Sequence, residues 1–168
     1  MAETTEARSK VAPGLLVGRV VSIHTAPDAT EPMTSLSEIQ ALAGAGLVGD
    51  RYFRGVGTYS GEKVTGRQLT LIEREALDAA STETGMDIRP RDSRRNIVTD
   101  GIGLNDLVGQ EFSVGEVRMR GVDLCEPCSH LAQLAGKPLI RSLVHRGGIR
   151  ADILSDGIIR VGDAVDPS

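Results

Sequence analysis

The chain has 168 residues, enough for one domain of ordinary size with a buried core. Aromatic residues make up only 2% of it and Trp is absent, so the core must be built from Val, Leu and Ile. The shortage of rings on which bases could stack, together with a formal net charge of −4, argues against a nucleic-acid partner.

No run of about 20 apolar residues is present, which argues against a membrane-spanning helix. The first dozen residues are polar and lack the apolar centre of a secretory signal. We therefore expect a cytoplasmic protein with a flexible tail over residues 1–14 and one domain over residues 15–168. Cysteines stay reduced in that compartment, which favours catalysis or metal binding over a structural disulfide.

The first half of the chain is interpreted from its hydrophobic periodicity and from its Gly and Pro residues. Alternating stretches rich in Val, Ile and Leu predict strands, and a capping Ser before a short run predicts a helix. In chain order the predicted elements are a strand over residues 16–24, a loop over 25–34, a short helix over 38–43 capped by Ser37, a glycine-studded loop up to residue 66, a strand over 67–73, and a helix over 74–84 closed by Gly85.

The second half of the chain is richer in short strands. The predicted elements there are a strand over residues 94–98, a tight turn over 104–108, a hairpin with strands 110–114 and 116–124 turned at Gly115, a helix with Leu131 and Leu134 on one face, a second helix with Leu139, Leu143 and Val144, and a C-terminal hairpin with strands 149–154 and 158–161. Short strands that do not alternate with helices as β-α-β units predict a mainly β fold with α decoration. The expected form is a closed, mostly antiparallel β-barrel with a few short helices.

The tetrad Cys125-Glu126-Pro127-Cys128 holds both cysteines of the chain, where a predicted strand gives way to a predicted helix. Pro127 suits the first position of a helix, which would place Cys128 among the unpaired amide groups of the first turn. Such a position stabilises a thiolate and can lower the pKa of a cysteine from about 8.5 to roughly 3.5–7.5. Cys128 is therefore the candidate catalytic nucleophile, and Cys125 is the candidate resolving thiol. His130 would point to one side of Cys128.

Three other interpretations of the cysteine pair stay open. Both residues are small and apolar enough to be buried core residues. A thioredoxin-type redox pair has the same spacing, although it belongs in a β-α-β context that this chain lacks. Cys125, Cys128, His130 and His145 also offer the ligand types of a zinc site, but no second pair of cysteines or histidines completes a tetrahedral structural site.

Further candidates for binding a substrate or cofactor lie near glycine-rich stretches. An Asp-Arg pair follows two glycines, where the backbone can approach a ligand closely or where an internal ion pair can fix a turn. Two consecutive arginines offer a guanidinium fork for phosphate or carboxylate, or lie on a solvated face. A His-Arg pair ends a predicted helix, where the helix dipole alone favours cations. The candidates are Asp50, Arg51, Tyr59, Arg94, Arg95, Asn96, His130, His145 and Arg146.

Six segments of the chain, in this order, together resemble the MOSC domain, which takes its name from the C-terminal domain of eukaryotic molybdenum cofactor sulfurase. They are GLVGDRY at residues 46–52, GTYS at 57–60, RQLTLIEREAL at 67–77, RRNIVTDGIGLNDLVGQEF at 94–112, LCEPCSHL at 124–131, and HRGGIRADIL at 145–154 with GIIRVGDAV at 157–165. The resemblance covers residues 17–165. It implies a β-barrel of the MOSC and pyruvate-kinase barrel-domain type, in agreement with the strands predicted above.

The resemblance also implies a role for one cysteine. A single family cysteine is thought to carry sulfur as a persulfide and to pass it to a metal–sulfur centre, including the molybdenum of molybdopterin enzymes, and Cys128 matches its position. A cysteine desulfurase is then the expected sulfur donor, and an anionic small molecule or molybdopterin is the expected acceptor. The chain lacks the pyridoxal-phosphate desulfurase domain of the eukaryotic sulfurase, so no pyridoxal-phosphate site of its own is expected.

The resemblance implies alternatives to sulfur transfer as well. Some relatives bind molybdenum cofactor through the same cysteine and reduce N-hydroxylated compounds. In that case Cys128 would be a permanent metal ligand, and the arginines would bind the cofactor phosphate. Another alternative is carbon–sulfur bond chemistry with zinc or another divalent ion held by Cys125, Cys128 and a histidine. A non-enzymatic carrier of a small molecule or cofactor is the last.

Overall fold

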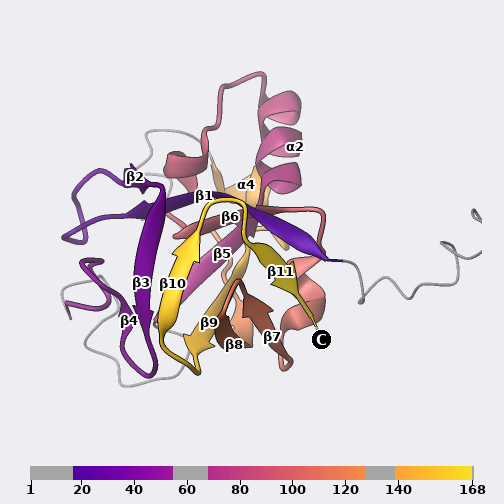
Figure 1. Ribbon diagram of the computed structural model, residues 1–168. Helices are drawn as coiled ribbons and strands as arrows, with labels where there is room; N and C mark the ends of the chain where they lie inside the picture. The colour runs from indigo at the N-terminus through magenta and orange to yellow at the C-terminus, as the bar shows by residue number, and fades with distance from the viewer. Residues whose placement is uncertain (1–16, 55–67, 128–138, 168) are drawn as a thin grey trace, which may run out of the picture.

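The computed structural model describes residues 17–54, 68–127 and 139–167, and in them seven strands close into a mixed β-barrel (Figure 1). Each neighbour in the ring is hydrogen-bonded, and the pairing of β1 with β11 closes it. In order around the ring the strands are β1 (Gly18–Thr25), β6 (Ile97–Asp100), β5 (Leu69–Glu73), β9 (Ile149–Ile153), β8 (Val117–Leu124), β7 (Glu111–Val114) and β11 (Ala164–Asp166). Neighbours are antiparallel except for β5 and β6, which are parallel. The predicted β-barrel is confirmed.

A smaller sheet lies beside the barrel, and its strands differ from two of the sequence predictions. It joins β3 (Glu38–Leu42), β4 (Gly46–Leu47) and β10 (Gly157–Arg160), while β2 (Thr34–Leu36) pairs with the end of β1. The helix predicted over residues 38–43 is wrong, because Ile39 and Ala41 are buried at a period of two and pair with β10.

The predicted C-terminal hairpin is also wrong. Strand β9 pairs with β5 and β8 inside the barrel, whereas β10 leaves the barrel and pairs with β3. The residues of both strands were recognised from their composition, but composition does not determine which partner a strand takes.

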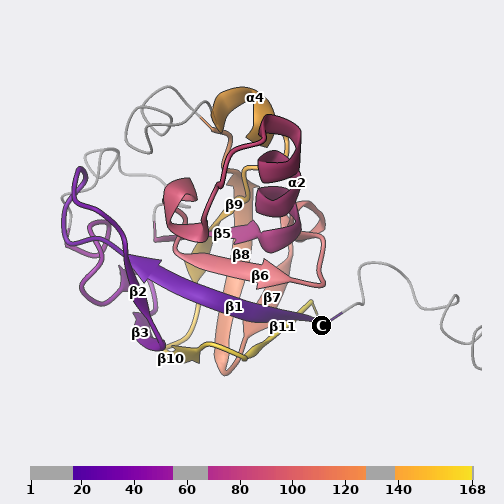
Figure 2. The ribbon, with the colours of Figure 1, turned by 90° about the horizontal axis from the view of Figure 1, so that it is seen from above.

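Two helices lie side by side on one side of the barrel (Figure 2). Helix α2 (Arg74–Thr84) has the predicted bounds and ends at Gly85, and α4 (Leu139–Leu143) coincides with the predicted second helix. The helix predicted around Leu131 and Leu134 lies outside the described residues. A small apolar cluster seats the helices on the sheet; it consists of Ile72, Leu77, Ala80, Ile88, Val98 and Leu143.

Short 3-10 turns complete the fold. The turn η3 (Leu104–Leu107) matches the predicted tight turn, and η2 (Pro90–Ser93) precedes β6. Arg94 has a left-handed backbone with a φ of 57°, so β6 begins at Ile97 and not at the predicted residue 94.

The inside of the barrel is aliphatic, as the composition requires. Val20, Ile23, Leu71 and Ile149 are all fully or almost fully buried there, and Phe112 is the large aromatic residue among them. No helix in the described ranges is long and apolar enough to cross a membrane.

Candidate functional site

The cysteine loop, by which we mean Cys125, Glu126 and Pro127, leaves the end of β8 and packs on the start of β9. Cys125 is a free, buried thiol, and its backbone N–H donates to the Gly148 carbonyl at 2.8 Å. Burial of Cys125 matches the alternative of a small core residue, and its role as a resolving thiol stays a prediction. Cys128 and His130 lie outside the described residues, so their predicted roles stay predictions.

The Arg95 side chain connects the cysteine loop to neighbouring segments by hydrogen bonds. Its side chain is buried, and its guanidinium donates from Nη2 to the Cys125 carbonyl at 2.7 Å and from Nε to the Gly147 carbonyl at 2.8 Å. A third bond runs to the Ser93 carbonyl at 3.3 Å. Charged donors make the stronger hydrogen bonds. One arginine therefore ties the cysteine loop, the segment before β9 and the segment before β6 together.

Two glycines make this close packing sterically feasible. A Cβ atom at Gly147 would lie 2.5 Å from the Cys125 carbonyl oxygen, and one at Gly148 would lie 1.9 Å from the Leu71 carbonyl oxygen. Gly148 also has a φ of +96°, which side-chain-bearing residues rarely adopt. The absence of a side chain at Gly147 thus lets the backbone of the cysteine loop pack directly against the backbone of the segment before β9.

His145 and Glu126 form a second tie between the same two segments. Glu126 accepts the backbone N–H of His145 at 2.8 Å through Oε1, and Nδ1 of the same histidine lies 3.0 Å from Oε2. The Asn105 side chain donates to the His145 carbonyl at 2.9 Å. His145 has a left-handed backbone with a φ of 61°.

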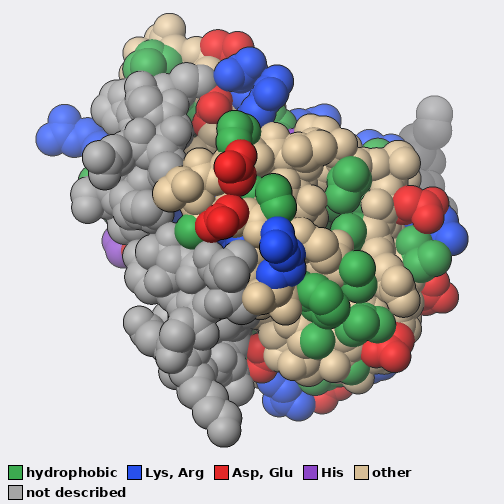
Figure 3. Space-filling model, turned by 90° about the vertical axis from the view of Figure 1, so that its left-hand side faces the viewer, with side chains coloured by type: hydrophobic (Ala, Val, Ile, Leu, Met, Phe, Trp, Pro, Cys, Tyr) green, Lys and Arg blue, Asp and Glu red, His purple; other side chains and the backbone are tan. Residues whose placement is uncertain are grey.

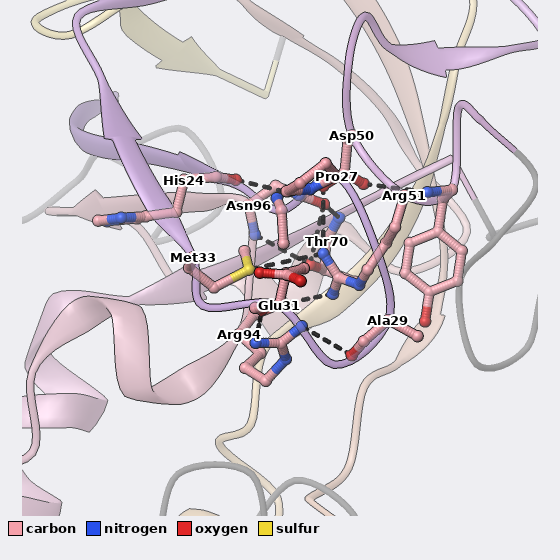
Figure 4. Close-up of polar contacts among 12 residues, drawn as sticks. His24, Pro27, Ala29, Glu31, Met33, Asp50, Arg51, Thr70, Arg94 and Asn96 are labelled. Carbon is pink, nitrogen blue, oxygen red and sulfur yellow. Dashed lines mark hydrogen bonds and ion pairs between the residues drawn. The ribbon is translucent and has the colours of Figure 1, made fainter.

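A separate arginine cluster, made of Asp50, Arg51, Arg94 and Asn96, lies beneath the loop of residues 26–33 (Figure 4). Nη1 of Arg51 donates to Oδ1 of Asp50 at 3.1 Å, and Nη2 donates to the Arg94 carbonyl at 3.2 Å. Nη1 and Nη2 of Arg94 donate to the carbonyls of Glu31 and Ala29 at 2.7 and 2.9 Å.

The arginine cluster carries more positive than negative charge in a buried place. Asp50, Arg51 and Arg94 are all buried, and the one carboxylate among them pairs with Arg51. Burial first, and then the neighbouring Arg51, lower the pKa of Arg94 to about 10, against the opposing effects of Asp50 and Tyr52. Arg94 is still charged at neutral pH, and this charge is met by backbone carbonyls.

Asn96 has a structural position between three strands. Its Nδ2 donates to the His24 carbonyl of β1 at 3.1 Å, and its Oδ1 accepts the Thr70 N–H of β5 at 3.0 Å. The side chain therefore extends the hydrogen bonding of the barrel at the point where β6 begins.

Of the remaining predicted site residues, Arg146 lies apart from both the cysteine loop and the arginine cluster. Arg146 pairs with Glu83 of α2 and donates from Nε to the Ser142 carbonyl at 2.6 Å, so it faces the helices. A cavity of about 210 Å³ lies there, lined by Glu83, Thr84, Arg141 and Ser142. Tyr59 lies outside the described residues.

Three residues near these groups were missed in the sequence. Glu126 lies inside the cysteine tetrad, so its place between the two cysteines was a signal, whereas nothing in the sequence relates Asn105 to the tetrad. His24 is buried between the Ser22 and Ser35 hydroxyls, at 2.8 and 3.1 Å, and burial, then Arg91, lower the pKa of its imidazole. No group of three or more metal-ligating side chains occurs among the residues described.

The surface beside the undescribed residues is mixed in charge. Figure 3 shows Lys or Arg side chains next to Asp or Glu side chains on this face. Selection of an anionic ligand would therefore depend on individual guanidinium groups and not on a broad positive field.

The fold and the two groups of polar residues define a β-barrel protein with a cysteine loop fixed by a buried arginine. The MOSC domain family matches residues 24–166, and the chain belongs to this family. No curated protein matches the sequence.

Solved structures share the fold. The YuaD protein from Bacillus subtilis is 16% identical, with a TM-score of 0.73 over 89% of this chain and 94% of that one. YiiM from Geobacillus stearothermophilus is 15% identical, with a TM-score of 0.69 over 90% and 75% of the two chains. YiiM from Escherichia coli is 16% identical, with a TM-score of 0.62 over 89% and 69%. At these identities the likeness concerns the fold alone.

Proposed function

We propose that the protein carries sulfane sulfur on Cys128 as a persulfide and passes it to an acceptor. The observation that supports this proposal most directly is the anchoring of the cysteine loop that leads into Cys128. Its backbone is held by Arg95, by the Gly148 carbonyl and by the Glu126–His145 contacts. The described chain is thus anchored two residues before Cys128, and anchoring near a reacting group reduces the freedom that is lost when substrate binds.

The loading step is a thiolate exchange without net oxidation. The Cys128 thiolate attacks the outer sulfur of a donor persulfide, a new S–S bond forms, the donor S–S bond breaks, and its electron pair leaves with the donor thiolate. A cysteine desulfurase is the proposed donor, and an anionic small molecule or a molybdopterin is the proposed acceptor. Because the desulfurase would carry its own pyridoxal phosphate, this chain needs no site for that cofactor.

Persulfide labelling tests the proposal. After incubation with a cysteine desulfurase and cysteine, we expect a persulfide-selective reagent to label wild-type protein at Cys128, as located by peptide mass spectrometry. Cys125→Ser is the matched control, because it removes the buried thiol and should keep at least half of the label. Equal labelling of Cys128→Ser and wild type would contradict the proposal.

The cofactor-dependent alternative meets a specific obstacle in the described residues. A cofactor phosphate at Arg94 would have to share this guanidinium with the carbonyls of Ala29 and Glu31, which both of its terminal nitrogens already bind. This arginine therefore already serves the loop of residues 26–33, which favours the carrier proposal over a phosphate clamp at this position. Metal analysis of purified protein separates the alternatives, because stoichiometric molybdenum or zinc that is lost in Cys128→Ser would overturn the carrier proposal.

A further inference from the structure

The cavity between α2 and α4 contains two unlike charges that do not pair with each other. Its volume is about 210 Å³, and the residues that line it are Glu83, Thr84, Arg141 and Ser142. Pockets for drug-sized ligands have volumes of about 300–1,000 Å³ and hold a few polar groups that converge on the ligand. This cavity is smaller, so it suits a small polar molecule.

Arg146 joins the two helices beside this cavity. Its Nε donates to the Ser142 carbonyl at 2.6 Å, and its Nη2 pairs with Oε2 of Glu83. Helix α2 has no basic residue in its own last turn. Arg146 therefore supplies the cation that the negative end of the helix dipole favours, and the helix end does not need a second cation.

Arg141 is a second cation at the same cavity. It is exposed near the end of α4, and no hydrogen bond or ion pair joins its guanidinium to any residue in the ranges 17–54, 68–127 and 139–167. Glu83 lines the same cavity, but the ion pair of its carboxylate is with Arg146. A guanidinium presents its donors as a planar fork that matches a carboxylate. Arg141 can therefore bind the carboxylate of a visiting molecule.

The negative side of the cavity is formed by Glu83 and the last turn of α2. Oε2 of Glu83 contacts Arg146, whereas Oε1 has no hydrogen bond to the part of the chain that the structure describes. The Thr84 hydroxyl is used within the helix end, because it donates to the Ala80 carbonyl at 2.8 Å and accepts the Met86 N–H at 3.2 Å. A carboxylate oxygen at the negative end of a helix favours an ammonium group.

We propose that this cavity binds a small zwitterion of the α-amino-acid class, with its carboxylate on Arg141 and its ammonium group on Glu83. The two side chains line one cavity without forming an ion pair, so a ligand that carries both charges can bridge them. An anion or a cation alone would satisfy only one of them. The site contains neither cysteine, so this inference does not depend on the proposed function.

Titration of the isotope-labelled full-length protein with alanine tests the proposal. Binding is followed through the backbone amide signals of residues 83–84 and 141–142. Acetate and ethylamine are the matched probes, because each carries one of the two charges of the zwitterion. We expect saturable shifts with alanine in the millimolar range, and binding of either matched probe that is at least about tenfold weaker at equal ionic strength.

Variants assign the two charges of the ligand to their partners. Arg141→Gln should weaken alanine binding at least about tenfold, because it removes the charged fork but keeps a polar side chain. Arg160→Gln is the control: this exposed arginine lies on β10, on the other side of the barrel from α4, and its loss should leave alanine binding unchanged (Figure 2). Glu83→Gln should abolish the preference for alanine over acetate.

Three results would overturn the proposal. Acetate that binds wild type as tightly as alanine would make this an anion site, and the absence of saturable shifts up to about 50 mM alanine would leave the cavity to water. Unchanged alanine binding in Arg141→Gln would exclude the guanidinium as the partner. Because the comparison of the three probes uses wild-type protein, it decides the matter even where a variant does not fold.

Discussion

Replacement of Arg95 by methionine would test whether this residue holds the cysteine loop in place. The substitution keeps a long unbranched side chain in the buried space and removes the guanidinium. It therefore leaves the carbonyls of Cys125 and Gly147 without the donors that lie 2.7 and 2.8 Å away.

The expected loss of stability comes mainly from these two carbonyls. A hydrogen bond from a charged donor contributes about 1.5–3 kcal/mol. The longer bond to Ser93, at 3.3 Å, adds less. Methionine costs less than a guanidinium to bury, which offsets part of the loss. We therefore expect the free energy of unfolding to fall by about 3 kcal/mol.

Urea unfolding at pH 8 measures this difference, because His24 is neutral there and the local charges are constant. Arg91→Met is the matched control: it removes an exposed arginine four residues earlier and should change the free energy of unfolding by no more than about 0.5 kcal/mol. In Arg95→Met the Cys125 amide, which donates to Gly148, should also exchange faster with solvent. If Arg95→Met loses no more stability than Arg91→Met, the bonds of this guanidinium do not hold the loop.

Two further predictions concern backbone packing and pH. Gly148→Ala places a Cβ atom 1.9 Å from the Leu71 carbonyl oxygen, whereas the Cβ of Gly49→Ala, at a φ of +89°, meets nothing within 4 Å. Gly49→Ala should therefore cost only the backbone strain of about 1–2 kcal/mol, and Gly148→Ala should melt at a much lower temperature. Equal melting temperatures of the two variants would refute the steric argument. Because burial, then Arg91, lower the pKa of His24 from 6.5, the unfolded chain binds the proton more readily, and stability present above pH 6.5 is lost as the pH falls below it. Urea unfolding at pH 7.5 and 5.5 should show a larger loss for wild type than for His24→Asn, and equal losses would contradict this account.

Elements whose signals are local were predicted closely. Helix α2 has the bounds expected from its periodicity and its terminal Gly85, and β7 and β8 form the hairpin expected around Gly115. The helix expected after Ser37 failed because a capping residue is a weak signal against strand pairing. The alternation of Ile39 and Ala41 was the correct signal there.

Candidate site residues were recognised by type but not by partner. Arg94 and Arg95 are adjacent in the sequence, yet the first donates to Ala29 and Glu31 and the second to Cys125 and Gly147. The left-handed backbone of Arg94 accompanies this divergence. A sequence motif contains no information about which distant carbonyl a buried guanidinium will meet.

The sequence by itself determined an aliphatic β-barrel of the MOSC family and drew attention to the tetrad that contains Cys125 and Cys128, because composition, periodicity and motif spacing are properties of neighbouring residues. Only the tertiary structure decided that β10 pairs with β3, that Arg95 donates to the Cys125 carbonyl, and that Glu126 contacts His145. Those contacts join residues 19 or more positions apart, and they form only once distant strands and loops have come together, which no local segment of the chain specifies.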